Sequence, residues 1–292
     1  METGRLAPAR PSLGAWERIA GVANLVRFRT APAGAALCVT GSRLAEERAD
    51  VVEVALTAIG IAFLIAFAQA FNEIVDRDLD AQSKPQRPLP SGAVSLPVAR
   101  SIAGACAALG VLAAAIADPR LVPFALILVV LSWLYSRRLK DTVLLGNLVV
   151  AALASSCVPY GAVIGGLDGR VFAAQGVVFS FSLAMELLKT TIDARGDAAA
   201  GIGTLASRYG VRAGARCSAA MCVVAALAAL ALTPLASNAV LYATAITVGA
   251  VILTLASAYL LWTRRPEENE LERSLQLLRV AWLGGIVSLL LL

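Results

Sequence analysis

The sequence predicts an all-α integral membrane protein, built as a bundle of about nine transmembrane helices. Two observations predict this fold class. First, the 292 residues are 59% hydrophobic and only 15% charged, with a mean hydropathy of +0.76, which is too apolar for a soluble domain of this length. Second, apolar stretches of about 17–25 residues, the length that crosses a bilayer core as a helix, recur along the whole chain.

The nine predicted spans follow one another with short connections, so we expect one domain over residues 16–292. Residues 1–15 contain Pro8 and Pro11 and lack the apolar run of a signal peptide, which predicts a flexible tail. The approximate bounds of the spans are 20–42, 53–75, 97–117, 120–136, 142–165, 171–192, 213–235, 238–262 and 274–292.

The distribution of basic residues predicts the orientation of the bundle. If the amino terminus is cytoplasmic, all but four of the 25 lysines and arginines fall on the cytoplasmic side. We therefore expect a multi-pass protein of a bacterial or archaeal cell membrane, surrounded by lipid, with two long cytoplasmic loops at about 76–97 and 193–212. The arginines lie on separate loops without interleaved aromatic residues, which argues against a nucleic-acid partner. Nothing in the sequence indicates an obligate protein partner. The four basic residues that do not fall on the cytoplasmic side are Arg43, Arg48, Arg120 and Arg170.

Two groups of acidic residues lie at or near these loops with a spacing of four, which places side chains on one face of a helix. Stacked carboxylates at membrane depth are costly unless they share a cation. Mg²⁺ prefers oxygen ligands and is commonly held by one or two carboxylates together with phosphate oxygens of a substrate. The pattern predicts a Mg²⁺ site that activates a diphosphate, with Asp76, Asp80, Asp193 and Asp197 as catalytic residues. The expected metal-site residues are Asn72, Asp76, Asp80, Asp193 and Asp197.

The alternative interpretation is that these acids cap helices or form solvated faces with Arg77, Arg87 and Arg195. For a single aspartate this alternative is the more common case. Two spaced groups on the same predicted membrane face favour the metal site.

Basic and hydroxyl side chains near the two groups are candidates for binding diphosphate oxygens. The positive-inside rule would place several of them there in any case. Lys189 differs, because it lies among apolar neighbours in FSLAMELLKTTID, where an unpaired ammonium is unfavourable. The predicted diphosphate-binding residues are Lys84, Arg87, Tyr135, Arg138, Lys140 and Lys189.

From about residue 27 to residue 292, the chain resembles the UbiA superfamily of intramembrane prenyltransferases. The segments that carry the resemblance are NEIVDRDLDAQSKPQRPLPSG, ELLKTTIDARGDAAAGIGTLASRYG and, more loosely, YSRRLKDTVLLGN. The resemblance implies nine helices around a central cavity that opens to lipid, with a polar loop cap over a Mg²⁺-diphosphate site. It also implies that Arg27 binds an anionic acceptor, although an arginine that snorkels to the interface would look the same. The chain departs from the family pattern at Glu73, Met185 and Thr190.

Three functions are compatible with these residues. The first is transfer of a prenyl or polyprenyl group from its diphosphate to a lipophilic acceptor, which could be an aromatic ring, a glycerol-type hydroxyl or another lipid. The short spacing from Asp80 to Arg87 resembles the spacing in the UbiA branches that make archaeal ether lipids or attach phytyl-type chains to chlorophyllide. The second is a terpene cyclase, in which the substrate's own double bonds capture the carbocation. The third is a carrier of ions or polar cargo, which the position of the acids at helix ends disfavours.

Overall fold

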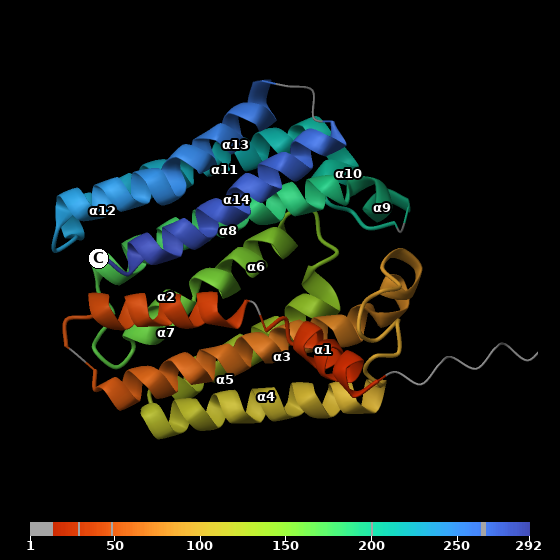
Figure 1. The fold of residues 1–292 in the computed structure, drawn as a ribbon, viewed down its shortest axis with the longest axis horizontal. Coiled ribbons are helices and arrows are strands. Elements are labelled where there is room, and N and C mark those ends of the chain that lie inside the picture. Colours follow the sequence, from red (N-terminus) through yellow and green to blue (C-terminus); the bar gives the residue numbers. More distant parts are fainter. Residues whose placement is uncertain (1–13, 29, 48, 200, 264–266) are drawn as a thin grey trace, which may run out of the picture.

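Helices make up all the regular secondary structure in the part of the chain that the computed structural model describes (Figure 1). That part comprises residues 14–28, 30–47, 49–199, 201–263 and 267–292, with the backbone alone at Arg195, Asp197, Ala199 and Thr263. Most of the predicted amino-terminal tail, 1–15, lies outside the described residues.

Seven of the helical segments are long and apolar enough to cross a membrane. The first three are α3 (Val51–Ser83), α4 (Leu96–Ala117) and α5 (Leu121–Leu134), which continues into the π-helical turn η1 (Tyr135–Leu139). The next two are α6 (Leu145–Ser155) followed by α7 (Cys157–Ala162), and α8 (Gly169–Ile192). The last two are α11 (Val211–Ala231) with the 3₁₀ turn η2 (Thr233–Leu235), and the run of α12 (Ala239–Ile246), η3 (Thr247–Val251, a π-helix) and α13 (Ile252–Thr263).

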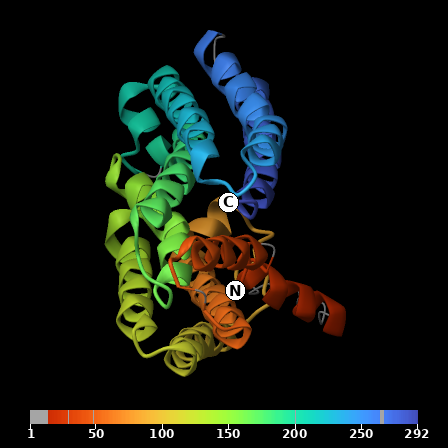
Figure 2. The same cartoon turned by 90° about the vertical axis from the view of Figure 1, so that its left-hand side faces the viewer.

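Two further predicted spans are helices that fall short of this criterion. The helix α2 (Ala31–Leu44) has only 14 residues, and α14 (Glu268–Leu289) carries charged residues in its first half. Both nevertheless pack with the others, since α14 contacts α13, α8 and α2. The last helix, α14, therefore contacts α2, which lies near the start of the chain. Figure 2 shows the red and orange amino-terminal helices in the lower half with the yellow α4 below them, α11–α14 in the upper half, and the green segments between.

The first predicted span, 20–42, is wrong as a single helix. The structure divides it into α1 (Ala15–Leu25) and α2, with a turn between them in which Arg27 has a φ of +43°. Pro32 lies in the first turn of α2, where its missing N–H costs no hydrogen bond, so a new helix begins there. The helix α1 packs on the loop after α3: Leu25 is fully buried, and Gly21 lies against Ala93 and Val94.

The short helix α2 packs against α7 through two glycines. A Cβ atom at Gly41 would overlap the carbonyl of Val158, and one at Gly161 would overlap the carbonyl of Cys38. Lipid tails are as apolar as the side chains, so membrane helices associate largely through close packing of this kind. This contact fixes α2, and with it the turn that carries Arg27.

The helix boundaries place the polar residues at one end of the bundle. An Asp50–Glu53 capping box begins α3, which runs without a break to Ser83. Asp168 caps the start of α8 by accepting hydrogen bonds from two backbone N–H groups. The carboxyl ends of α3 and α8 therefore lie at the same end as α9 (Ala194–Ala199) and α10 (Leu205–Tyr209), on the right in Figure 1.

Candidate functional site

The first acidic group lies on the last turns of α3 rather than in a loop. Because α3 continues to Ser83, Asn72, Asp76 and Asp80 share one face of a regular helix. The Asn72 Nδ2 group donates a hydrogen bond of 3.0 Å to Asp76 Oδ2. Asp80 is buried, whereas Asp76 is partly buried. The stripe thus faces the inside of the bundle.

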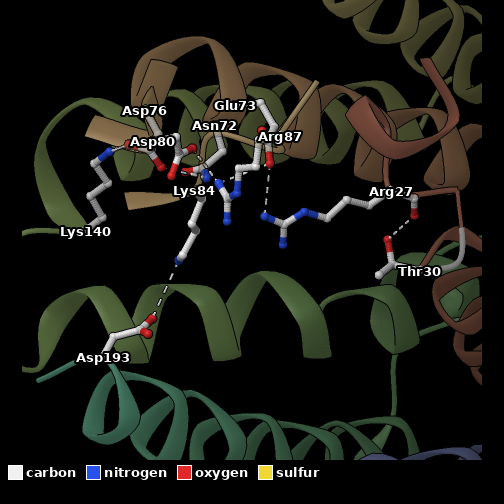
Figure 3. A network of polar contacts seen from close by, with 10 residues as sticks. All are labelled: Arg27, Thr30, Asn72, Glu73, Asp76, Asp80, Lys84, Arg87, Lys140 and Asp193. Atoms are coloured by element: carbon white, nitrogen blue, oxygen red, sulfur yellow. Dashed lines mark hydrogen bonds and ion pairs between the residues drawn. The ribbon is translucent and has the colours of Figure 1, made fainter. Parts of the chain in front are cut away.

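The second acidic group lies opposite, where α8 ends. Asp193 is the C-terminal cap residue of α8, and its side chain is 55% exposed. Lys84, which follows α3, reaches across so that its Nζ lies 3.9 Å from Asp193 Oδ2 (Figure 3). Asp197 belongs to α9, but its side chain lies outside the described residues. The two groups that are more than 110 positions apart in the sequence therefore face each other.

Each described carboxylate of the predicted metal set is paired with a base predicted to bind diphosphate. Asp80 Oδ2 lies 2.6 Å from Arg87 Nη1, and Asp76 Oδ1 forms an ion pair with Lys140 Nζ. The third pair is Lys84 with Asp193. Burial lowers the pKa of the Lys140 side chain, and the nearby Asp141 carboxylate opposes that shift. The ion pair with Asp76 opposes it further, because an adjacent carboxylate favours the charged ammonium.

The remaining predicted bases are placed differently. Lys189 has a partner, as its apolar surroundings require, but this partner is Glu186 on the preceding turn, at 2.6 Å. Tyr135 is half-buried and Arg138 is exposed, and neither belongs to the network in Figure 3. Both lie in η1, and π-helical turns of this kind are frequent at functional sites.

The structure adds three residues that the sequence interpretation did not place in the site. Glu73 is buried and pairs with both Arg27, at 3.3 Å, and Arg87, at 3.2 Å. The guanidinium of Arg137 lies 5.8 Å from the centre of the Phe71 ring, which holds η1 against α3.

Asn147 is the third of these residues. It is buried and donates a 3.2 Å hydrogen bond to Thr190 Oγ1, joining α6 to α8 beside Lys189. The only sequence signal was its presence in the loosely matching YSRRLKDTVLLGN segment.

The donor atoms suit Mg²⁺, since they are carboxylate and amide oxygens from two facing helix ends. Among the described side chains, no group of three or more acidic, histidine or cysteine residues lies close enough together to enclose a metal ion. Mg²⁺ needs only one or two protein carboxylates when phosphate oxygens complete its coordination. The residues therefore fit an ion that binds together with a diphosphate.

A polar cleft of about 610 Å³ adjoins α9 at the same end of the bundle. The turn after η1 forms one wall, through Asp141 and Thr142. The other wall is formed by Ala198, Gly201, Ile202, Gly203, Ser207 and Arg208. The chain thus leaves a polar, open region beside the second acidic group, in keeping with a site for charged head groups.

Comparison with known proteins agrees with the family resemblance seen in the sequence. The model of the UbiA prenyltransferase family matches residues 33–280. The digeranylgeranylglyceryl phosphate synthase of Methanopyrus kandleri is 38% identical over 197 residues, which cover 68% of this chain and 71% of that protein. The enzyme of the same name from Ignicoccus hospitalis is 35% identical over 214 residues, covering 70% of each chain.

Solved structures of UbiA homologues share the fold. The apo structure of a homologue from Aeropyrum pernix K1 has a TM-score of 0.74 and 20% identity, covering 89% of this chain and 98% of that one. A homologue from Archaeoglobus fulgidus bound to DMAPP and Mg²⁺ has a TM-score of 0.67 and 18% identity, covering 93% and 99%. At these identities the comparison establishes the all-helical membrane fold.

Proposed function

Because the chain belongs to the UbiA prenyltransferase family, we propose that it transfers a polyprenyl group from its diphosphate to the hydroxyl of a glycerol-type lipid acceptor. The observation that carries the choice of acceptor is the 38% identity to the Methanopyrus kandleri enzyme, whose name describes a glyceryl phosphate with two geranylgeranyl groups. A geranylgeranyl donor and an acceptor that carries a phosphate are therefore the substrates to test first.

The geometry supports the first step, cleavage of the bond between the prenyl carbon and the diphosphate oxygen. The electron pair leaves with the diphosphate, so positive groups must stabilise the growing negative charge. Lys84, Arg87 and Lys140 surround the acidic groups and can move onto phosphate oxygens. Bound Mg²⁺ would supply further neutralising charge. The residues that would hold it are Asn72, Asp76, Asp80, Asp193 and Asp197.

The second step joins the prenyl carbon to the acceptor oxygen, whose proton passes to the released diphosphate. Water would compete for the same carbon, so the site must be shielded from it. Asp80 and Glu73 are buried, and α1 covers the adjoining loop through Leu25. This burial keeps water away from the α3 side of the site, which favours transfer to a lipid over hydrolysis there.

The proposed place of reaction is the cytoplasmic face of a bacterial or archaeal cell membrane. The seven apolar helices support a multi-pass membrane protein. The carboxyl ends of α3 and α8, which carry the described acidic residues, lie at the end of the bundle that the positive-inside rule assigns to the cytoplasm. An acceptor dissolved in the membrane would reach this end from the inner leaflet.

The test uses purified protein in liposomes with Mg²⁺ and labelled prenyl diphosphates of several lengths, with and without a glycerol-type phospholipid acceptor. We expect an ether-linked product only when the acceptor is present, and no product with Asp76→Asn or Asp193→Asn. A terpene formed without acceptor would identify a cyclase instead. Absence of diphosphate release under all conditions would contradict an enzymatic function.

A further inference from the structure

Glu73 lies outside the four-residue spacing of the metal set, yet it is among the most buried acids of the described residues, with 3% of its surface exposed. Its Oε1 atom contacts two guanidiniums, and its Oε2 atom is buried without a hydrogen-bond partner in the described structure. A buried carboxylate oxygen that accepts no hydrogen bond destabilises the fold, because nothing compensates for its lost contact with water. The presence of such a destabilising group at Glu73 calls for a specific role.

The first guanidinium, that of Arg87, is held from two sides. Its Nη1 atom lies 2.6 Å from Asp80 Oδ2 and 3.2 Å from Glu73 Oε1. These two acids are seven residues apart on α3, so they lie about two turns apart on the same face. The carboxylates therefore fix the direction of Arg87 along the stripe of metal-site residues.

The second guanidinium, that of Arg27, comes from a different part of the chain. Its Nη2 atom lies 3.3 Å from Glu73 Oε1, and its side chain is 40% exposed. Arg27 also has a φ of +43°, in a region that is strained for a residue other than glycine and that often marks a functional constraint. Figure 3 shows this side chain extended from the α1–α2 turn toward Glu73.

We propose that Glu73 is a positioning residue for both substrates: it orients Arg87 toward the prenyl diphosphate and Arg27 toward the phosphate of the lipid acceptor. The inference rests on the proposed function. A guanidinium is planar and presents several N–H donors in a fixed fork, so a carboxylate on one edge leaves other donors directed at a phosphate. One buried acid thus sets the relative position of two phosphate-binding groups.

The test measures steady-state kinetics with donor and acceptor varied separately, using Glu73→Gln, Glu73→Asp, Arg27→Gln and the double variant Glu73→Gln/Arg27→Gln. We expect Glu73→Gln to raise both KM values by about tenfold or more, the effect of losing one charge-assisted contact, while kcat changes much less. Glu73→Asp keeps the charge and should recover part of the loss. Asp78→Asn is the matched control, since Asp78 is an exposed acid on α3 that pairs with Arg77, and it should leave both KM values unchanged.

The double variant distinguishes positioning from general damage to the fold. If Glu73 acts on the acceptor through Arg27, Glu73→Gln will not raise the acceptor KM further once Arg27 is Gln. It will still raise the donor KM, because that effect passes through Arg87. The proposal is wrong if Glu73→Gln leaves both KM values unchanged, or if the acceptor KM rises equally in the two backgrounds.

Binding measurements keep the proposal testable without turnover. Calorimetry with Mg²⁺ and a non-cleavable prenyl diphosphate analogue should show weaker binding to Glu73→Gln than to Glu73→Asp, with thermal unfolding recorded for each variant. Equal affinities would overturn the donor half of the proposal. If the parent protein forms no ether-linked product, the proposed function fails, whereas the binding data still decide whether Glu73 positions Arg87.

Discussion

Asp76 and Asp193 occupy equivalent places in the two acidic groups, yet the structure predicts different costs when each is replaced by alanine. The side chains of Asp76 and its partner Lys140 are only 14% and 18% exposed. The side chains of Asp193 and Lys84 are 55% and 41% exposed, and their charged atoms are 3.9 Å apart. The first pair is largely removed from solvent, and the second is not.

The expected magnitudes follow from this difference in burial. Removing one partner of a buried ion pair costs about 3–5 kcal/mol, because the other charge remains buried and unpaired. Some water reaches Lys140, so we expect Asp76→Ala to lower the free energy of unfolding by about 2–3 kcal/mol, toward or below the lower end of that range. An exposed pair contributes about 0–1 kcal/mol, and Asp193→Ala should cost no more than this.

The assay is chemical or thermal unfolding of the parent protein, both single variants and Asp76→Ala/Lys140→Met in one detergent. The double variant should be more stable than Asp76→Ala, because methionine removes the unpaired buried charge. Both aspartate variants should lose prenyl transfer. Asp193→Ala should lose activity but keep nearly the stability of the parent protein, whereas Asp76→Ala should lose both. Equal losses of stability for the two single variants, or no recovery in the double variant, would refute this reasoning.

Three further outcomes are expected. Gly41→Ala should lower the free energy of unfolding by about 1–3 kcal/mol or more, because its Cβ would overlap the carbonyl of Val158. Gly104→Ala is the control, since a Cβ there meets no atom within 4 Å, and equal losses in the two variants would contradict the packing account. Asn147→Ala should lower the free energy of unfolding by about 1 kcal/mol, because it removes the hydrogen bond to Thr190. An unchanged free energy of unfolding would show that this bond does not stabilise the fold. Chelation with EDTA should abolish diphosphate release, and excess Mg²⁺ should restore it; activity that persists would exclude the metal site.

Hydropathy predicted most of the bundle because a bilayer imposes a minimum length on every helix that crosses it. The runs that became α3, α4 and α8 were located to within a few residues at their amino-terminal ends. The division of the first span into α1 and α2 was not predicted. Apolar content alone does not distinguish one span from two short helices, and the break depends on the Arg27 turn and on Pro32.

The spacing of four predicted that Asn72, Asp76 and Asp80 share a face of α3, because that depends only on helix geometry. It did not predict the partners that come from distant segments: Lys140 from the end of η1 for Asp76, and Arg27 for Glu73. The sequence interpretation noted Glu73 only as a departure from a family pattern. Its two arginine partners come from the α1–α2 turn and from the loop after α3, a combination that no local pattern contains.

These partners also change what the stacked carboxylates imply. From the sequence, the repulsion among acids at membrane depth favoured a shared metal ion. In the structure, a basic side chain already neutralises the charge of each described aspartate of the metal set: Lys140 for Asp76, Arg87 for Asp80 and Lys84 for Asp193. The fold can therefore form before any ligand binds. The case for Mg²⁺ therefore rests on the oxygen donors and on the family rather than on charge repulsion. It also follows that Mg²⁺ and diphosphate should bind together, since each base that leaves a carboxylate needs a phosphate oxygen as its new partner.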